Sequence, residues 1–236
     1  SYQKAMTASS SEEGREPSFA TDENIQTWWR AAGNQPGEWI SMDLGEVKDV
    51  RAVQINFADD KIDAPLPGER QGERYIDPSQ HKTRWLLEAS ADGTNYFVLE
   101  DKSNAETNLP HDFVVKEEGV QIRYLKLTVF EVPYSQNPCV SGLRVFGLGN
   151  GEKPTEPQYQ AERVGTMDMR ITIEPQADAV GYNVLWGFAP DKLYHSCMTF
   201  TAEQNIGALV EGETVYVRVD AFNENGITEG TKVIKL

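Results

Sequence analysis

The chain has 236 residues, of which 39% are hydrophobic and 25% are charged, and this balance excludes a disordered chain. Its 37 acidic and 22 basic side chains give a formal net charge of -15. We therefore expect no nucleic acid and no membrane as a partner, because neutralising phosphates requires clustered Lys and Arg.

Alternating apolar residues, broken by Gly, Pro, Asn and Asp, recur along the first 150 residues and predict an all-β fold. In "EWISMDLG", Ile40, Met42 and Leu44 alternate with polar residues, so one face of the strand is expected to be buried. "AVQINF" and "RYLKLTVFEV" follow the same pattern. The dipeptide Asp92-Gly93 predicts a hairpin turn.

Two stretches interrupt the alternation. Residues 58–83 form an irregular segment longer than an ordinary β connection, and such loops tend to be functional or disordered. Residues 149–157, "GNGEKPTEP", concentrate Gly, Pro and charge, as linkers between independently packed domains do. The sequence therefore predicts a first domain over 1–150, a linker over 151–157, and a smaller β-sandwich of about seven strands over 158–236.

Several motifs in the first half together resemble the factor V/VIII type C, or discoidin-like, domain, and the resemblance covers nearly all of residues 1–148. They are "TASS", "FATDENIQTWW", "EWISMDLG", "ASADGTNYFVL", "RYLKLTVF" and "SGLRVFG". In the second half, "GYNVLW" and "VYVRVDAFNENG" resemble a fibronectin type III domain, although "MRITIEP" lacks the tryptophan usual in an early strand. More narrowly, "DENIQTWWRA" and "CVSGLRVFGLGNGEKP" resemble the C-terminal part of Bacteroides-type proteins with an upstream family 43 glycoside hydrolase domain.

These resemblances imply a galactose-binding-like β-sandwich, or jelly roll, that holds a glycan, followed by a smaller fibronectin type III-like sandwich. They imply a non-catalytic region that targets a secreted glycoside hydrolase to polysaccharide, with the hydrolase domain upstream in the same polypeptide. A bacterial extracellular, periplasmic or cell-surface location and a monomeric state are expected. The alternative is a structural or protein-interaction appendage that packs on the upstream catalytic domain without binding sugar.

The resemblance implies a ligand site at one end of the first domain. Galactose specificity is not implied, because family 32 carbohydrate-binding modules that take galactose have Trp-His where this chain has Trp29-Arg30. They also have an Arg-Gln-Asp segment where this chain has residues 58–60. The expected ligand-binding residues, of which the two aromatic ones flank the long loop and would stack on a sugar ring, are Arg30, Asp59, Asp60, Tyr75, Trp85, Tyr134 and Asn137.

The remaining tryptophans of the first half are interpreted by their packing. Trp29 and Trp39 are expected to lie in the core, because large aromatic rings dominate small β cores. Trp28 points opposite to its neighbour, and both a core and a ligand-binding role stay open for it.

Discoidin-like sugar binders often hold a structural calcium ion in the loop that matches "ATDENIQT". By that resemblance the Ala20 carbonyl and the oxygens of Asp22, Asn24 and Thr27 are the candidate calcium ligands. The acidic residue that closes such a site falls at Gly142, which favours an empty loop. Calcium is thus one candidate cofactor, and none is certain.

Catalytic signatures are missing from the sequence. The pairs Asp59-Asp60 and His111-Asp112 are adjacent residues, whose side chains point to opposite faces of an extended chain and cannot converge on one substrate atom. The sequence contains neither GxSxG nor HExxH nor a phosphate-binding Gly loop. We therefore expect no enzymatic activity. Lipid binding of the coagulation type is disfavoured as well, because it needs apolar loop tips ringed by basic residues, and these loops are acidic.

Overall fold

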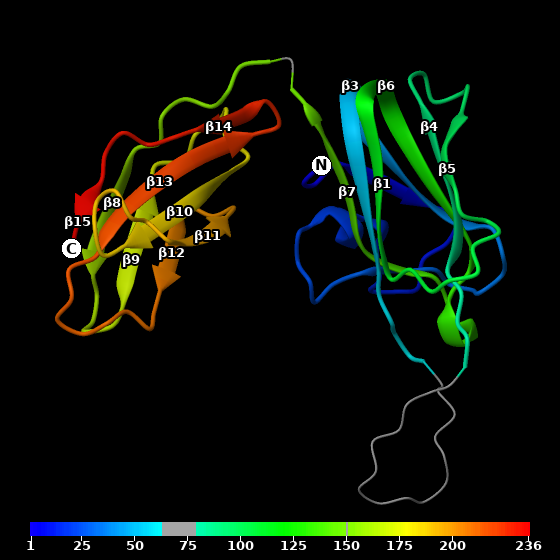
Figure 1. Cartoon of the computed structure of the whole chain (residues 1–236), viewed down its shortest axis with the longest axis horizontal. Helices are drawn as coiled ribbons and strands as arrows, with labels where there is room; N and C mark the ends of the chain where they lie inside the picture. The colour runs from blue at the N-terminus through cyan, green and yellow to red at the C-terminus, as the bar shows by residue number, and fades with distance from the viewer. Residues whose placement is uncertain (63–78, 150) are drawn as a thin grey trace, which may run out of the picture. The chain divides into compact units, whose positions relative to one another are not determined.

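The computed structural model describes residues 1–62, 79–149 and 151–236. The chain divides into two compact units, Ser1–Leu148 and Gly149–Leu236, which are described separately. Strands make up nearly all of the regular structure of both units (Figure 1). The prediction of an all-β chain is therefore confirmed.

The first unit is built around two long antiparallel strands, β3 (Glu38–Phe57) and β6 (His111–Glu131), which pair along most of their length. The strands follow the order β2-β7-β3-β6-β4-β5, and β1 pairs with the beginning of β3. The remaining elements of this unit are β1 (Ala5–Ala8), the 3-10 helix η1 (Pro17–Thr21), β2 (Trp29–Arg30), β4 (Arg84–Ser90), β5 (Phe97–Asp101), the 3-10 helix η2 (Pro133–Ser135) and β7 (Cys139–Leu148).

A break in the β3–β6 register, between Asp43 and Lys48, divides this unit into two layers. Before the break, β3 pairs with β1 and with residues 124–129 of β6. Beyond it, β3 pairs with residues 111–122 of β6 and with β7. We call the layer of β1, β4, β5, residues 38–43 and residues 124–131 the front sheet. The layer of β2, β7, residues 48–57 and residues 111–122 is the back sheet.

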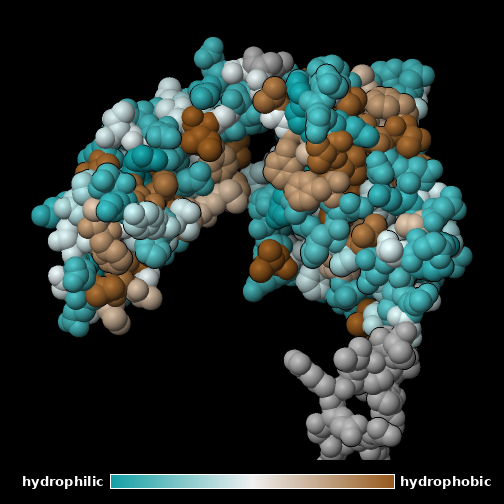
Figure 2. Space-filling model, in the orientation of Figure 1, coloured by the Kyte–Doolittle hydropathy of each residue, from teal (hydrophilic) through white to brown (hydrophobic). Residues whose placement is uncertain are grey.

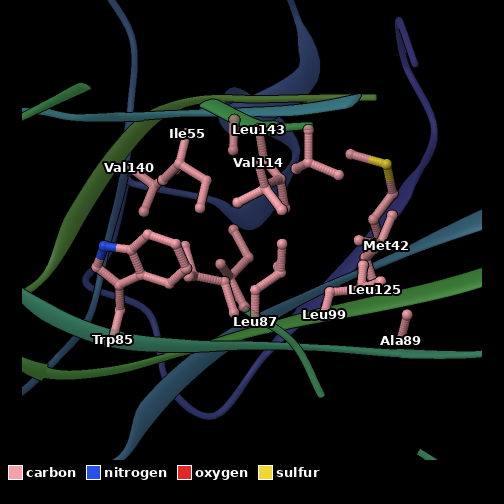
Figure 3. Close-up of a cluster of buried hydrophobic side chains, with 14 of the residues drawn as sticks. Met42, Ile55, Trp85, Leu87, Ala89, Leu99, Val114, Leu125, Val140 and Leu143 are labelled. Carbon is pink, nitrogen blue, oxygen red and sulfur yellow. The ribbon is translucent and has the colours of Figure 1, made fainter. Parts of the chain in front are cut away.

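The two sheets enclose one hydrophobic core. Ile40, Met42 and Leu44 are buried, whereas Ser41 and Asp43 between them lie on the outer face, so the predicted alternation is confirmed. Figure 3 shows buried side chains of the front sheet facing those of the back sheet, namely Trp85, Leu87, Ala89 and Leu125 against Ile55, Val114, Val140 and Leu143. Burial of such side chains stabilises the fold by about 1.5–3 kcal/mol each.

The predicted hairpin turn at Asp92-Gly93 is confirmed between β4 and β5. Gly93 has φ +77°, which a residue without Cβ adopts at no steric cost. The Asp92 carboxylate accepts backbone N–H groups of Thr94 and Asn95, both at 2.8 Å. These bonds to Asn95, followed by those to Thr94 and to Ser90, hold the pKa of Asp92 well below its usual range.

The second unit is a smaller sandwich of two antiparallel sheets. One sheet has the order β12-β9-β8, and the other has the order β11-β10-β13-β14 with β15 also paired to β13. Their strands are β8 (Tyr159–Arg163), β9 (Met169–Ile173), β10 (Gly181–Gly187), β11 (His195–Thr199), β12 (Glu203–Ile206), β13 (Tyr216–Asn223), β14 (Gly226–Thr228) and β15 (Ile234–Lys235). A separate core includes Ile171, Val184 and Val217.

The segment expected to be a linker, 151–157, packs on the second unit instead. Pro154 and Pro157 are buried, and the Glu152 carbonyl accepts the side-chain amide of Asn223 at 3.0 Å. The Thr231 backbone N–H donates to Glu156 at 2.7 Å. Gly and Pro are abundant in linkers, but here both prolines are buried and polar groups of the segment have fixed partners in the second unit.

The visible surface of the protein is mainly hydrophilic, with hydrophobic patches between the polar residues (Figure 2). Within the part of the chain that the structure describes, no helix has the length and apolar character needed to cross a bilayer.

Candidate functional site

A hollow opens at the end of the first unit that carries η2. It consists of two adjoining parts with volumes of about 430 and 160 Å³. Both parts are lined by His81, Val132, Pro133, Tyr134 and Gln136. We call this hollow the apex pocket. Its combined size lies in the range of about 300–1,000 Å³ that is usual for small-molecule sites.

Tyr134 gives the apex pocket a fixed aromatic wall. Its ring lies 4.2 Å from the His81 ring, centroid to centroid, at an angle of 43°. Tyr134 and Ser135 have φ values of 60° and 50°, in the left-handed region that non-glycine residues rarely adopt. Such conformations cost about 1–3 kcal/mol each and cluster at functional sites. The local backbone thus holds the ring in place at an energetic cost.

Gln136 joins the two loops that border the pocket. The side chain is only 7% exposed, and its Nε2 donates to Asp59 Oδ1 at 2.7 Å. Its Oε1 accepts the Asp60 backbone N–H at 3.0 Å. Because Gln136 fixes one of its oxygens, the exposed Asp59 carboxylate is held in one orientation beside the smaller part of the pocket.

Asp60 and Arg30, both expected to contact a ligand, are instead engaged with other side chains. Asp60 Oδ2 accepts the Trp28 indole N–H at 3.1 Å and lies 3.4 Å from Arg15 Nε. Arg30 is buried, forms an ion pair with Glu12, and lies 3.8 Å from Asp60. The Arg15 guanidinium lies 4.0 Å from the centroid of the Trp28 ring. Trp28 therefore packs within this charged network. Ligand contact by Arg30 and Asp60 stays a prediction.

Two of the expected tryptophan positions, Trp85 and Trp39, differ from prediction. Trp85 is fully buried in the core, so it offers no surface for stacking, and its prediction as a ligand platform is wrong (Figure 3). Asn137 Nδ2 donates to the Ala31 carbonyl at 2.8 Å and serves the packing of its loop. Trp29 is buried, as predicted, whereas Trp39 lies partly exposed on the outer face of the front sheet, with Lys126 Nζ 5.4 Å from its ring centroid.

Of the expected ligand residues, Tyr134 and Asp59 therefore lie at the apex pocket. Tyr75 lies outside the described residues. Sequence reasoning missed His81 and Gln136, which line both parts of the pocket. His81 falls inside the irregular segment 58–83, and Gln136 lies between the expected ligand residues Tyr134 and Asn137. No local pattern indicates which of these side chains turn toward one another.

The loop with the candidate calcium ligands satisfies the oxygens of Asp22 internally. Asp22 Oδ1 accepts the Asn24 backbone N–H at 2.9 Å, and Oδ2 accepts the Thr27 hydroxyl at 2.7 Å. The adjacent Glu23 carboxylate forms an ion pair with Arg144 of β7, with Oε2 2.7 Å from Nη2. A guanidinium thus neutralises the acidic group of this loop.

The space in which an acidic side chain at position 142 would lie is also occupied. A Cβ atom at Gly142 would lie 2.9 Å from Asn56 Nδ2, so the Asn56 side chain occupies the space beside this glycine. Among the described residues, no group of three His, Cys, Asp or Glu side chains could hold a metal ion. Of Ala20, Asp22, Asn24 and Thr27, only Asp22 carries a carboxylate, and both of its oxygens accept hydrogen bonds within the loop, so a calcium site here stays a prediction.

Comparison with known protein families indicates which type of domain part of the chain resembles. Residues 5–66 match the F5/8 type C domain family. This match agrees with the predicted discoidin-like, galactose-binding-like character of the first unit. A search of curated proteins finds no match.

Several solved carbohydrate-binding modules are similar to part of this chain. Chitosan-binding module 1 of a chitosanase/glucanase from Paenibacillus sp. IK-5 is 19% identical, with a TM-score of 0.47, and 62% of this chain covers 96% of that chain. Module 2 of the same enzyme, in complex with chitotriose, is 16% identical, with a TM-score of 0.47 and coverage of 62% and 98%. The module CpGH89CBM32-4 from Clostridium perfringens, in complex with GlcNAc-alpha-1,4-galactose, is 14% identical, with a TM-score of 0.47 and coverage of 61% and 90%.

Proposed function

We propose that the first unit is a non-catalytic carbohydrate-binding module whose apex pocket holds a glycan. The observation that carries this proposal is the pairing of a fixed aromatic ring, Tyr134, with an oriented carboxylate, Asp59, in one pocket. Pyranose rings combine an apolar face with a rim of hydroxyl groups, so an aromatic wall beside fixed acceptors suits them. The F5/8 type C match of residues 5–66 supports this reading.

The charges around the pocket favour a neutral ligand. Asp59 is an acidic residue at the rim, and the whole chain carries a net charge of -15. Lys82, which also lines the pocket, forms an ion pair with Glu106. An anionic polysaccharide would therefore meet repulsion, whereas neutral hydroxyl groups can donate hydrogen bonds to Asp59.

The second unit is proposed to be a fibronectin type III-like spacer. A three-stranded sheet packed against a larger sheet, with β8, β9 and β12 on one side, supports that assignment. We further propose that the chain belongs to a secreted bacterial glycoside hydrolase, with the catalytic domain upstream, in the extracellular space or periplasm or on the cell surface. Tethering to polysaccharide would then raise the local substrate concentration of that domain.

One observation favours the alternative, a protein-interaction appendage. The outer face of the back sheet exposes Phe113, Val115, Phe146 and Leu148, and the rings of Phe113 and Phe146 stack with centroids 6.1 Å apart. Contiguous exposed apolar side chains of this kind often mark protein interfaces. A neighbouring protein domain could pack on this face whether or not the apex pocket binds a sugar.

Calorimetric titration with a panel of neutral glycans, including chitotriose and GlcNAc-alpha-1,4-galactose, tests the proposed function. The informative variant is Tyr134→Asn, because Asn tolerates the left-handed backbone and removes only the ring. Loss of a stacking anchor should cost about 1–3 kcal/mol, which is roughly ten- to hundredfold in Kd. The matched control is Tyr194→Ala, which removes an exposed tyrosine of the second unit.

Two results would contradict the proposal. Absence of binding to every glycan of the panel would leave the appendage as the better reading. Binding that Tyr134→Asn and Tyr194→Ala weaken equally would show that the apex pocket is not the site.

A further inference from the structure

A second groove, of about 440 Å³, lies on the outer face of the front sheet, away from the apex pocket. Its floor is formed by short side chains of neighbouring strands, since Thr7 pairs with Ser41 and Ala5 pairs with Asp43. On the other side of β3, Asp43 pairs with Tyr124 of β6. The small residues of β1 and β3 therefore leave a hollow that borders on a tyrosine. We call it the front-sheet groove.

Two tyrosine rings border this groove. Tyr96, in the connection that leads into β5, is 36% exposed. Tyr124 is half-buried and held on two sides. The Arg123 guanidinium lies 4.9 Å from its ring centroid, and a Cβ atom at Gly93 would lie only 3.1 Å from its Cε2. The hairpin can approach Tyr124 this closely because residue 93 is a glycine, and the ring is thereby fixed.

The polar groups of the groove are also held in place. Asp43 accepts two hydrogen bonds from Arg123, at 2.7 and 2.8 Å, and a third from the Gly45 backbone N–H at 2.8 Å. The Ser41 hydroxyl donates to the Leu125 carbonyl at 2.8 Å, which leaves its lone pairs directed away from that bond. Groups fixed in this way lose little conformational entropy when a ligand binds.

We propose that the front-sheet groove is a second glycan-binding site, which takes neutral pyranose units of a polysaccharide. Both carboxylates of the groove are engaged, because Asp43 is paired with Arg123 and Asp92 accepts hydrogen bonds within the hairpin turn. An anionic ligand would find no positively charged side chain among the described lining residues. Sugar hydroxyls, in contrast, match the oxygens of Thr7, Ser41 and Asp43, and the apolar face of a pyranose matches an exposed tyrosine ring.

This inference goes beyond the proposed function, which concerns the apex pocket alone. Two sites on one unit could engage two stretches of the same polysaccharide, and the second contact would then be intramolecular. Affinity for a long chain should therefore exceed affinity for a short oligosaccharide, because only the long chain can reach both sites.

Residue-resolved NMR on the isotope-labelled full chain can separate the two sites. The probes are cellohexaose, xylohexaose, mannohexaose and N-acetylchitohexaose, each titrated separately. We expect at least one of them to shift the backbone amides of Thr7, Gly93 and Tyr96. The amides of His81 and Gln136 report on the apex pocket in the same spectra.

Two variants test the groove from opposite directions. Tyr96→Ala removes an exposed ring, and Thr7→Trp fills the hollow from the exposed face of β1. Each should weaken the titration followed at Gly93 by about tenfold or more, while the titration followed at His81 stays unchanged. Tyr134→Asn should do the reverse, and Tyr194→Ala should change neither. A dispersed amide spectrum confirms that each variant is folded.

The outcomes distinguish this inference from the proposed function. Shifts confined to the apex pocket would overturn the second site and leave the proposed function intact. Shifts confined to the groove would support the second site and refute glycan binding at the apex. If no probe shifts either set of amides, or if the groove titration is unchanged in both Tyr96→Ala and Thr7→Trp, the inference is refuted.

Discussion

Trp85 tests most directly whether a side chain that was expected to bind a ligand belongs instead to the hydrophobic core. Its side chain is fully buried against residues of both sheets (Figure 3), so Trp85→Ala should act on stability. Removing a buried Trp costs about 3–5 kcal/mol, out of a total stability of about 5–15 kcal/mol for a typical domain. At about 2–4 °C per kcal/mol, the Tm of the first unit should fall by roughly 6–20 °C.

A milder substitution at residue 85 separates the contribution of ring packing to stability from that of the unpaired indole N–H. The Trp85 indole N–H is buried with no hydrogen-bond partner among the described residues, and such an unsatisfied donor costs about 1–3 kcal/mol. Trp85→Phe removes this donor while keeping an aromatic ring in the core, so it should cost far less than Trp85→Ala.

Urea unfolding followed by tryptophan fluorescence measures both variants, because four of the five tryptophans, Trp28, Trp29, Trp39 and Trp85, lie in the first unit. Glycan binding should be retained by any Trp85→Ala molecules that are folded. A variant with unchanged unfolding and abolished glycan binding would refute the core assignment and restore Trp85 as a ligand platform.

Three further predictions concern charge and protonation. EDTA should leave the Tm unchanged, whereas Arg144→Met should lower it, since Arg144 balances Glu23 in the loop with the candidate calcium ligands. A Tm that falls with EDTA and recovers with Ca²⁺ would contradict this. Burial raises the pKa of Tyr159 from 10.0 to about 12, so the unfolded state loses this proton first as pH rises. The stability advantage of wild type over Tyr159→Phe should thus be constant below pH 10 and decline between pH 10 and about 12. A stability difference that grows with pH would contradict a raised pKa of Tyr159 in the folded state. Glycan affinity should change less than about twofold between about 50 and 500 mM NaCl, because a neutral ligand releases no counterions, and a steep decline would indicate an ionic ligand.

The alternation of apolar and polar residues predicted most strands of the first unit. The same alternation would have corrected two wrong expectations, those for Trp85 and Trp39. In "RWLLEAS", Trp85 has the same parity as Leu87 and Ala89, which are buried, so the pattern itself places it inside. Trp39 has the parity of Ser41 and therefore lies on the outer face, although its size favoured the core. In both cases the two-residue period was a better guide than the chemical character of the side chain.

The apex pocket was harder to predict, because its geometry depends on contacts between loops that are distant in sequence. The bonds from Gln136 to Asp59 and Asp60 form only when two loops meet, and no local pattern encodes that meeting. The left-handed backbone at Tyr134 is equally hidden, since non-glycine residues seldom adopt it. Likewise, nothing near Arg30 in sequence indicates that Glu12 and Asp60 would neutralise it.

Charge pairing connects the two sites to the kind of ligand they can hold. Asp60 lies against Arg15 and Arg30 behind the apex, and Asp43 pairs with Arg123 in the groove. Because these guanidinium groups are matched by carboxylates of the same unit, they position loops and side chains and offer little net attraction to an anion. What remains toward a ligand is an aromatic ring with nearby hydroxyl and carboxylate oxygens at each site, Tyr134 with Asp59 and Tyr96 with Thr7 and Ser41. In a chain of net charge -15, that combination suits the neutral, hydroxyl-rich ligands proposed above and disfavours anionic ones.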